Sequence, residues 1–127
     1  MALVGVALRP PLLGSSSMYK MIFGAKRKPG MSREDFAAYW LGPHAEKARK
    51  VPGIHRYVIS LAADLGGNPD LPFDGFAESW FLDRDAMRLS GRSEEIKVVL
   101  ADELNLFDLA TRWSMITEEH VQIGGTV

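Results

Sequence analysis

The amino-acid sequence predicts an α+β domain in which two helices cover one face of a four-stranded antiparallel sheet. The first observation is the order of the elements, because strand, helix and strand follow one another twice along the chain. The second is the spacing of apolar residues at three and four positions in both helical segments. The third is the length of 127 residues, 46% of them hydrophobic, which suffices for one core. The domain is expected over residues 18–123, with residues 1–17 as a flexible N-terminal extension and residues 124–127 as a frayed C-terminus.

The first half of the fold begins with a strand at Tyr19–Lys26, in which side chains alternate between two faces. A basic turn with Pro-Gly leads to a helix that runs to about Lys50. Ser32 and Asp35 form a capping box at the start of this helix. A Pro-Gly pair ends the helix, and Ile54–Ala62 is predicted as the second strand.

The second half follows a loop at Asp64–Pro72 and begins with a strand at Phe73–Leu82. Asp83 is expected to cap a short helix, and Ser93 a longer one that extends to about Phe107. After a connection, the last strand is predicted at Ser114–Ile123.

The best single candidate for acid–base chemistry is His44. Phe36, Trp40, His44 and Ala48 are four residues apart, so two aromatic rings and an imidazole share one helix face. Pro43 interrupts the helix just before His44, and the sequence leaves open whether it kinks or ends the helix. An imidazole beside a helix break and buried aromatic surface suits the rim of a pocket. The alternative is a histidine that fills the edge of the core with one nitrogen satisfied.

The sheet face that the helices leave uncovered is predicted to be apolar. Tyr57, Ile59, Phe76 and Trp80 are expected on this face, where they form a large hydrophobic patch. Two such sheets packed face to face would close into a barrel that encloses a cavity. The sequence therefore predicts a homodimer.

Further polar candidates lie on the later strands. Asp74 and Glu78 point the same way, and desolvation in an apolar cavity would raise the pKa of such carboxyl groups and make one a proton carrier. The alternative is that both are exposed or paired with an arginine such as Arg56. His55 and His120 are isolated on strands, where a structural or surface role is the simpler interpretation.

The bulk composition argues against several functional classes. Lys+Arg 15 and Asp+Glu 16 leave a formal net charge of -1, which gives no electrostatic case for nucleic acid or a membrane surface as partner. The lack of cysteine excludes disulfides, thiolate metal sites and a cysteine nucleophile, and it fits a cytoplasmic protein. No phosphate-binding loop and no recognised metal-ligand spacing is present, so neither a metal nor a cofactor is expected.

The residues of these elements resemble the EthD-like family of dimeric α+β-barrel proteins. The resemblance rests on KRKPGMSREDFAAYWLGPHAEKARKVPGIHRYV, FDGFAESWF and EEHVQI, which follow in order between about Tyr19 and Ile123. It implies a ferredoxin-like βαββαβ monomer whose sheet pairs with that of a second subunit. Similar proteins include cofactor-independent enzymes that act on aromatic, polyketide-derived or lactone substrates. Others are accessory proteins of ether-degrading gene clusters, and related barrels bind or break down haem.

The resemblance also assigns roles by position. His44 matches the histidine of a Trp-x-x-x-His motif, and Tyr57 matches the tyrosine after Pro-Gly. The predicted catalytic residues are His44, Asp74 and Glu78. The predicted substrate-binding residues are Trp40, Tyr57, Phe76, Trp80 and His120. Two hypotheses remain open: a cofactor-independent enzyme for a small aromatic, polyketide-like or lactone molecule, and a non-catalytic binding or accessory protein for a hydrophobic molecule or a partner enzyme.

Overall fold

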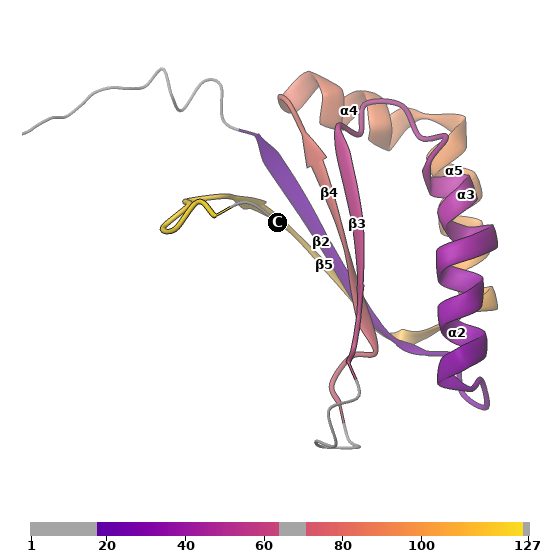
Figure 1. The fold of residues 1–127 in the computed structure, drawn as a ribbon. Coiled ribbons are helices and arrows are strands. Elements are labelled where there is room, and N and C mark those ends of the chain that lie inside the picture. The colour runs from indigo at the N-terminus through magenta and orange to yellow at the C-terminus, as the bar shows by residue number, and fades with distance from the viewer. Residues whose placement is uncertain (1–17, 64–70, 126–127) are drawn as a thin grey trace, which may run out of the picture.

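Four strands form one antiparallel sheet in the order β3-β4-β2-β5 (Figure 1). The strands are β2 (Tyr19–Arg27), β3 (Arg56–Leu61), β4 (Gly75–Phe81) and β5 (Phe107–Glu118). Helices connect β2 to β3 and β4 to β5, so the chain has the predicted split βαβ topology of a ferredoxin-like fold.

This computed structural model describes residues 18–63 and 71–125. The extension expected at residues 1–17, most of the loop expected at Asp64–Pro72 and the last two residues lie outside the described ranges. Within those ranges, no helix has both the length and the apolar character needed to cross a membrane.

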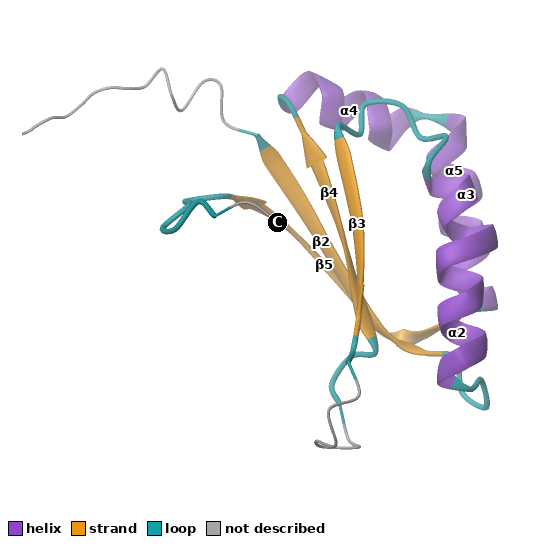
Figure 2. Cartoon of the chain, viewed as in Figure 1, coloured by secondary structure: helices purple, strands orange, loops and turns teal. Residues whose placement is uncertain are grey.

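The helices lie on one face of the sheet, and the described chain leaves the other face uncovered (Figure 2). The first helical segment consists of α2 (Arg33–Tyr39), a π-helical turn (Trp40–His44) and α3 (Ala45–Ala48). The second consists of α4 (Arg84–Arg92), α5 (Glu94–Asp102) and a 3₁₀ turn (Glu103–Asn105). The long segments α2–α3 and α5 pack beside each other through α3 and α5.

All three predicted helix caps are confirmed. In each one the side-chain oxygen accepts a hydrogen bond from the backbone N–H three residues later: Ser32 from Asp35 at 3.0 Å, Asp83 from Ala86 at 2.8 Å, and Ser93 from Ile96 at 3.1 Å. These bonds satisfy backbone donors that the first helical turn leaves free, which fixes where each helix begins.

The expected break at Pro43 takes the form of a π-helical turn, and the helix continues through it. The Ala45 N–H donates to the carbonyl oxygen of Trp40, five residues earlier, as in a π-helix. Proline has no N–H to donate to the carbonyl four residues before it, so the widened turn accommodates the residue without ending the helix.

The last strand begins seven residues earlier than the sequence predicts, and the helix before it is correspondingly shorter. α5 ends at Asp102, and the expected connection before Ser114 is part of β5. Leu106 and Phe107 are buried core residues at helical spacing from the apolar stripe of α5, so the sequence pattern predicts a longer helix. A register shift between Gly24 and Lys26 then lets β5 continue along β2.

One predicted assignment to a sheet face is wrong. Tyr57 and Ile59 pack against the core beneath the helices and do not lie on the uncovered face. Their alternation with Arg56 and Val58 was predicted correctly, but alternation does not say which face the helices cover. Phe76, Trp80 and Glu78 alternate with the core residue Ala77 and lie on the uncovered face as expected.

The core that joins sheet and helices is a cluster of edge-on aromatic rings. Trp40 is 1% exposed, and its ring centroid lies 5.3 Å from that of Phe36 and 4.8 Å from that of Phe107. A Cβ atom at Gly75 would lie 2.7 Å from the Cζ3 atom of Trp40. The glycine of β4 therefore allows the helix to approach the sheet this closely.

Gly53, in the turn before β3, gives the first testable prediction. Its φ is +88°, and a Cβ atom there would collide with the carbonyl oxygen of Ala86 at the start of α4. We expect Gly53→Ala to lower the free energy of unfolding by about 3 kcal/mol, because strain and a backbone collision add. Gly30 has a φ of +83° with nothing within 4 Å, so Gly30→Ala should cost only about 1 kcal/mol. If urea unfolding showed equal losses of unfolding free energy for Gly53→Ala and Gly30→Ala, the collision with Ala86 would be contradicted.

Candidate functional site

A cavity of about 100 Å³ lies between the helices and the covered face of the sheet. Both helical segments and β2, β3, β4 and β5 contribute to its wall. Its lining residues include Phe23, Trp40, His44, Tyr57, Phe107 and Arg112. The wall is mostly apolar, and a few polar groups converge on it, which is typical of a small-molecule site.

His44 is 4% exposed and is held in one orientation by a carboxylate. Its Nδ1 atom lies 2.8 Å from the Oδ2 atom of Asp102, at the end of α5. His44 lines the cavity and Asp102 does not, and Nε2 is the ring nitrogen of His44 that Asp102 leaves free. Among the described residues, no hydrogen bond occupies this Nε2 atom.

Asp102 is 5% exposed and accepts hydrogen bonds from several donors. The Tyr39 hydroxyl donates at 2.7 Å and the Asn105 amide at 2.9 Å, both to Oδ1. Burial acts to raise the pKa of Asp102, but the hydrogen bonds from Tyr39, Asn105 and His44 outweigh it and lower the pKa below its usual value. The carboxylate is therefore charged at neutral pH and accepts from the Nδ1–H of His44, and in the neutral imidazole this tautomer has its lone pair on Nε2.

The π-helical turn explains why two residues five positions apart reach the same carboxylate. Tyr39 and His44 would point about 140° apart on a regular α-helix, which has roughly 3.6 residues per turn. A π-helical turn has more residues per turn than an α-helix, so it brings residues five apart closer to the same side of the helix. Both side chains thus contact Asp102. π-Helical turns of this kind recur at functional sites.

Trp40 and Tyr57, which both line the cavity, each carry one polar hydrogen. The Nε1 atom of Trp40 is buried and has no hydrogen-bond partner within the described residues. Burial raises the pKa of the Tyr57 hydroxyl, while its contact with the Trp40 indole and the charge of Arg49 act in the opposite direction. Tyr57 is thus protonated at neutral pH and is available as a donor.

An ion pair closes another part of the wall. Arg112 of β5 binds both carboxylate oxygens of Glu103, with distances of 2.7 Å from Nε and 3.3 Å from Nη2. The guanidinium also stacks over the ring of Phe23, 5.1 Å from its centroid. Glu103 is buried, so this pair supplies a neutral polar edge to the cavity.

Asp74 lies away from His44, at the far end of β4. Its carboxylate accepts from the backbone N–H of Arg27 at 2.8 Å and from Nη1 of the same residue at 3.0 Å. The sequence left open that Asp74 pairs with an arginine such as Arg56. Asp74 is indeed paired with an arginine, but the partner is Arg27. Asp74 does not line the cavity.

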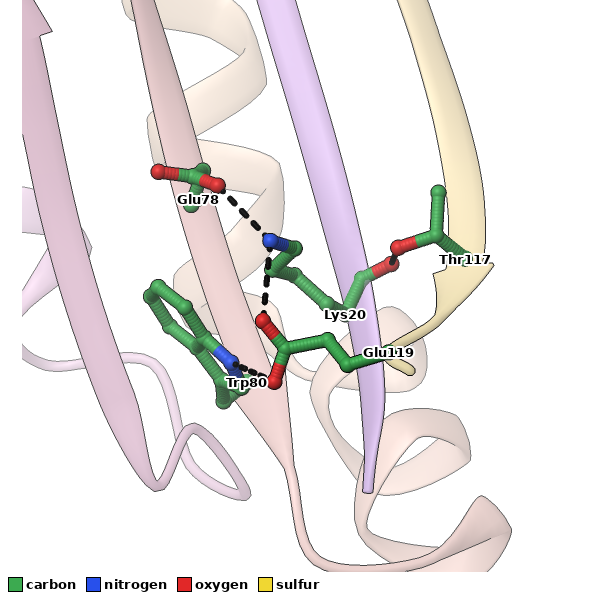
Figure 3. A network of polar contacts seen from close by, with 5 residues as sticks. All are labelled: Lys20, Glu78, Trp80, Thr117 and Glu119. Carbon is green, nitrogen blue, oxygen red and sulfur yellow. Dashed lines mark hydrogen bonds and ion pairs between the residues drawn. The ribbon is translucent and has the colours of Figure 1, made fainter. Parts of the chain in front are cut away.

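Glu78 and Trp80 lie on the opposite face of the sheet from His44 and belong to a polar network there (Figure 3). The Lys20 ammonium lies 2.9 Å from Glu78 and 3.0 Å from Glu119, so both carboxylates are ion-paired. The Trp80 Nε1–H donates to Glu119 at 3.0 Å. The guanidinium of Arg56 stacks over the Trp80 ring at 5.0 Å and pairs with neither Asp74 nor Glu78.

The two remaining predicted binding residues also lie outside the cavity. Phe76 packs with Phe73 and Trp113 on the uncovered face, with ring centroids 5.4 and 6.0 Å away. His120 follows β5 and is exposed. The structure therefore brings together Trp40, His44 and Tyr57, and it separates them from the other five predicted residues.

Sequence reasoning missed Asp102, although a signal for it exists. Asp102 lies three residues after Val99 and four before Leu106, in line with the apolar stripe of the helix. A carboxylate at a buried stripe position requires partners, and that requirement points to a polar group on the facing helix. In the described ranges, no three histidine, aspartate or glutamate side chains converge as metal ligands.

Comparison with known proteins places the chain in a family. The EthD domain profile matches residues 28–110, which include both helical segments, β3, β4 and the start of β5. The chain belongs to the EthD domain family. No match was found among curated proteins.

Solved structures share the fold of this EthD protein. An EthD family protein (BH0200) from Bacillus halodurans C-125 is 24% identical with a TM-score of 0.66, over 81% of this chain and 99% of that one. A dimeric ferredoxin-like protein of unknown function from Thermobifida fusca YX is 14% identical with a TM-score of 0.63, over 82% and 92%. SnoaB from Streptomyces nogalater, a cofactor-independent oxygenase, is 14% identical with a TM-score of 0.53, over 85% and 96%.

The lowered pKa of Asp102 predicts how the stability of this EthD protein depends on pH. In the folded chain the pKa of Asp102 lies below its ordinary value of 3.8. The ionised carboxylate therefore stabilises the fold above pH 3.8. This contribution is lost as the pH falls from about 5 through 3.8 and then through the lower folded pKa.

Urea unfolding at a mildly acidic and a strongly acidic pH tests this dependence. We expect Asp102→Asn to lose less stability between the two conditions than the wild type, because its side chain does not titrate. Asp85→Asn, whose carboxylate is 92% exposed, should keep the wild-type loss. An equal loss in wild type and Asp102→Asn would contradict the account.

Proposed function

We propose that this protein is a cofactor-independent enzyme that performs acid–base chemistry on a small aromatic, polyketide-like or lactone molecule. The observation that carries the proposal is the buried His44–Asp102 pair, which leaves Nε2 of the imidazole for an apolar cavity. The carboxylate fixes the ring orientation and the tautomer, and it stabilises the imidazolium that forms when Nε2 accepts a proton.

The cavity restricts what part of a substrate enters. An engineered apolar cavity of about 150 Å³ holds one benzene molecule, so the present volume of about 100 Å³ suits a single small ring or a short chain end. Larger substrates would place only their reacting end beside His44. The aromatic rings of Trp40, Tyr57 and Phe107 provide flat contacts for such a group.

A solved structure of similar fold supports the class of enzyme. SnoaB is a cofactor-independent oxygenase of similar fold, which makes chemistry without a cofactor a reasonable expectation for this architecture. Fold alone does not determine activity, so the reaction is inferred from the His44 site.

Replacement of His44 tests the proposal. Wild type and His44→Gln would be incubated with a panel of one-ring aromatic, lactone and 1,3-dicarbonyl compounds, and conversion would be followed by mass spectrometry. We expect His44→Gln to reduce the turnover of any converted compound roughly 10²–10⁴-fold, as for loss of a general base. His120→Gln, which changes an exposed histidine, should leave turnover unchanged. Equal turnover by wild type and His44→Gln would remove His44 from the mechanism.

A second candidate function is binding without conversion. The separation of Asp74 and Glu78 from His44 favours it, because the carboxylates predicted from the sequence are engaged in ion pairs elsewhere. In that case the panel would yield ligands that shift the NMR signals of cavity residues but are recovered unchanged. His44→Gln would then alter affinity only.

The proposal includes a cytoplasmic homodimer. The lack of cysteine supports the location. The uncovered sheet face, with Phe76, Trp113 and the half-exposed Met115, supports self-association, and the Thermobifida fusca protein of similar fold is described as dimeric. Sedimentation at several concentrations would test this part, and a monomer at all concentrations would contradict it.

A further inference from the structure

We propose that the indole N–H of Trp40 is a hydrogen-bond donor to a substrate carbonyl oxygen, and that the substrate is therefore a small enolisable carbonyl compound. The inference rests on the proposed function, because it uses His44 as the base that acts on the same molecule. It assigns a binding partner and a substrate class that the His44–Asp102 pair alone does not specify.

The first support is that the Trp40 donor lacks a partner. Trp40 is 1% exposed and its Nε1 atom is buried, and among the described residues only the Tyr57 hydroxyl lies beside it, without forming a hydrogen bond of normal geometry. Nearly all buried donors in folded proteins are paired, since an unpaired one loses its hydrogen bond to water without replacement. A ligand oxygen in the cavity would supply the missing acceptor.

The second support is the direction of the ring. The Cζ3 edge of the indole lies against Gly75, where a Cβ atom would be only 2.7 Å away. Nε1 is on the opposite side of the ring system from Cζ3, so it points away from Gly75. On that side it neighbours the hydroxyl of Tyr57, and Trp40, Tyr57 and His44 all line the cavity.

The third support is the charge of the donors. The indole N–H and the Tyr57 hydroxyl are neutral, and the nearby guanidinium of Arg112 is already bound by Glu103. The Asp102 carboxylate lies directly behind His44, which disfavours a ligand that arrives as an anion. Neutral donors next to a base suit a neutral carbonyl group whose oxygen gains charge during the reaction.

The step balances without a further reactant. The Nε2 lone pair of His44 takes a proton from the carbon next to the carbonyl, and the electrons of that C–H bond form a C=C bond. The carbonyl electron pair moves to oxygen, where the Trp40 N–H stabilises the enolate, while Asp102 stabilises the imidazolium. The imidazolium then returns the proton to the same or another carbon, so nothing is oxidised or reduced.

Cyclohexanone is a suitable probe, because it combines one ring with one carbonyl group. In ¹H–¹⁵N spectra of the wild type, we expect it to move the Trp40 indole proton downfield. The signals of Trp80, whose N–H already donates to Glu119, and of Trp113 on the uncovered face should remain in place. Benzene, a ring of similar size without an acceptor, should not cause the downfield shift. A Trp40 signal that cyclohexanone leaves unchanged up to its solubility limit would overturn the inference.

Exchange of the cyclohexanone α-hydrogens with D₂O tests the catalytic consequence. We expect the wild type to accelerate exchange and Trp40→Phe to reduce kcat roughly 10²-fold, as for loss of one oxyanion donor. The spectra above use the wild type, so they decide the inference even if Trp40→Phe fails to fold.

The two measurements separate this inference from the proposed function. Exchange that requires His44 without any change in the Trp40 signal would overturn the role of Trp40 and leave the enzyme intact. A Trp40 signal that moves while no hydrogen exchanges would support the carbonyl site and overturn the enzyme in favour of binding.

Discussion

Asp102→Ala is expected to lower the free energy of unfolding by about 3 kcal/mol, because it removes the acceptor for a buried imidazole, a tyrosine hydroxyl and an amide. The hydrogen bonds from the His44 ring and the Tyr39 hydroxyl both end on Asp102, and His44 is too deeply buried to regain a bond to water. Equilibrium unfolding in urea, with the m-value compared between variants, measures the loss.

A matched pair of variants isolates the cause. Asp85→Ala removes a carboxylate that is 92% exposed and should change stability by less than about 0.5 kcal/mol. Asp102→Asn keeps an oxygen acceptor and should cost less than Asp102→Ala. A loss for Asp102→Ala as small as that for Asp85→Ala would show that the network adds nothing to the fold.

Trp40→Ala is expected to cost about 3–5 kcal/mol, which is the usual range for truncation of a buried tryptophan. The Trp40 ring fills the space between Phe36, Phe107 and Gly75, and the neighbours are too closely packed to close the resulting cavity. Thermal and urea unfolding measure the effect.

Leu41 gives the control, because it lies next to Trp40 in the same π-helical turn and is 52% exposed. Leu41→Ala should cost less than about 1 kcal/mol. Similar losses for both variants would indicate that the turn itself, and not the packing of Trp40, limits stability.

The sequence predicts the fold well where signals are local. The caps at Ser32, Asp83 and Ser93 are recognisable because an N-cap oxygen bonds to a backbone N–H only three residues away. The strand alternation is equally local. It does not define which face the helices cover, which is why Tyr57 and Ile59 were placed on the wrong face.

The candidate site is harder to predict, because it depends on contacts between distant segments. His44 and Trp40 were recognisable from their spacing on one helix, but Asp102 lies 58 residues after His44. The π-helical turn that aligns Tyr39 with His44 has no clear sequence pattern beyond an internal proline. The position of Glu78 among aromatic residues predicts a proton carrier, yet its partner is Lys20 on the neighbouring strand.

Two separate groups of polar residues lie on opposite faces of the sheet. Asp102, Tyr39 and Asn105 form a buried support that faces away from the cavity, and His44 connects this support to the cavity wall. The Lys20–Glu78–Glu119 network lies on the other side of the sheet, where the proposed second subunit would pack. Variants of the first region should therefore change the proposed catalysis, and variants of the second should change the proposed assembly.

The tautomer of His44 tests the central claim most directly. Long-range ¹H–¹⁵N NMR of the imidazole rings distinguishes the two nitrogens, and His44→Gln identifies the signals among the three histidines. We predict that the neutral form of the ring carries its proton on Nδ1, bonded to Asp102, and has an unprotonated Nε2. A proton on Nε2 of the neutral ring would contradict the account, because that nitrogen would then have no lone pair with which to accept a proton from a substrate.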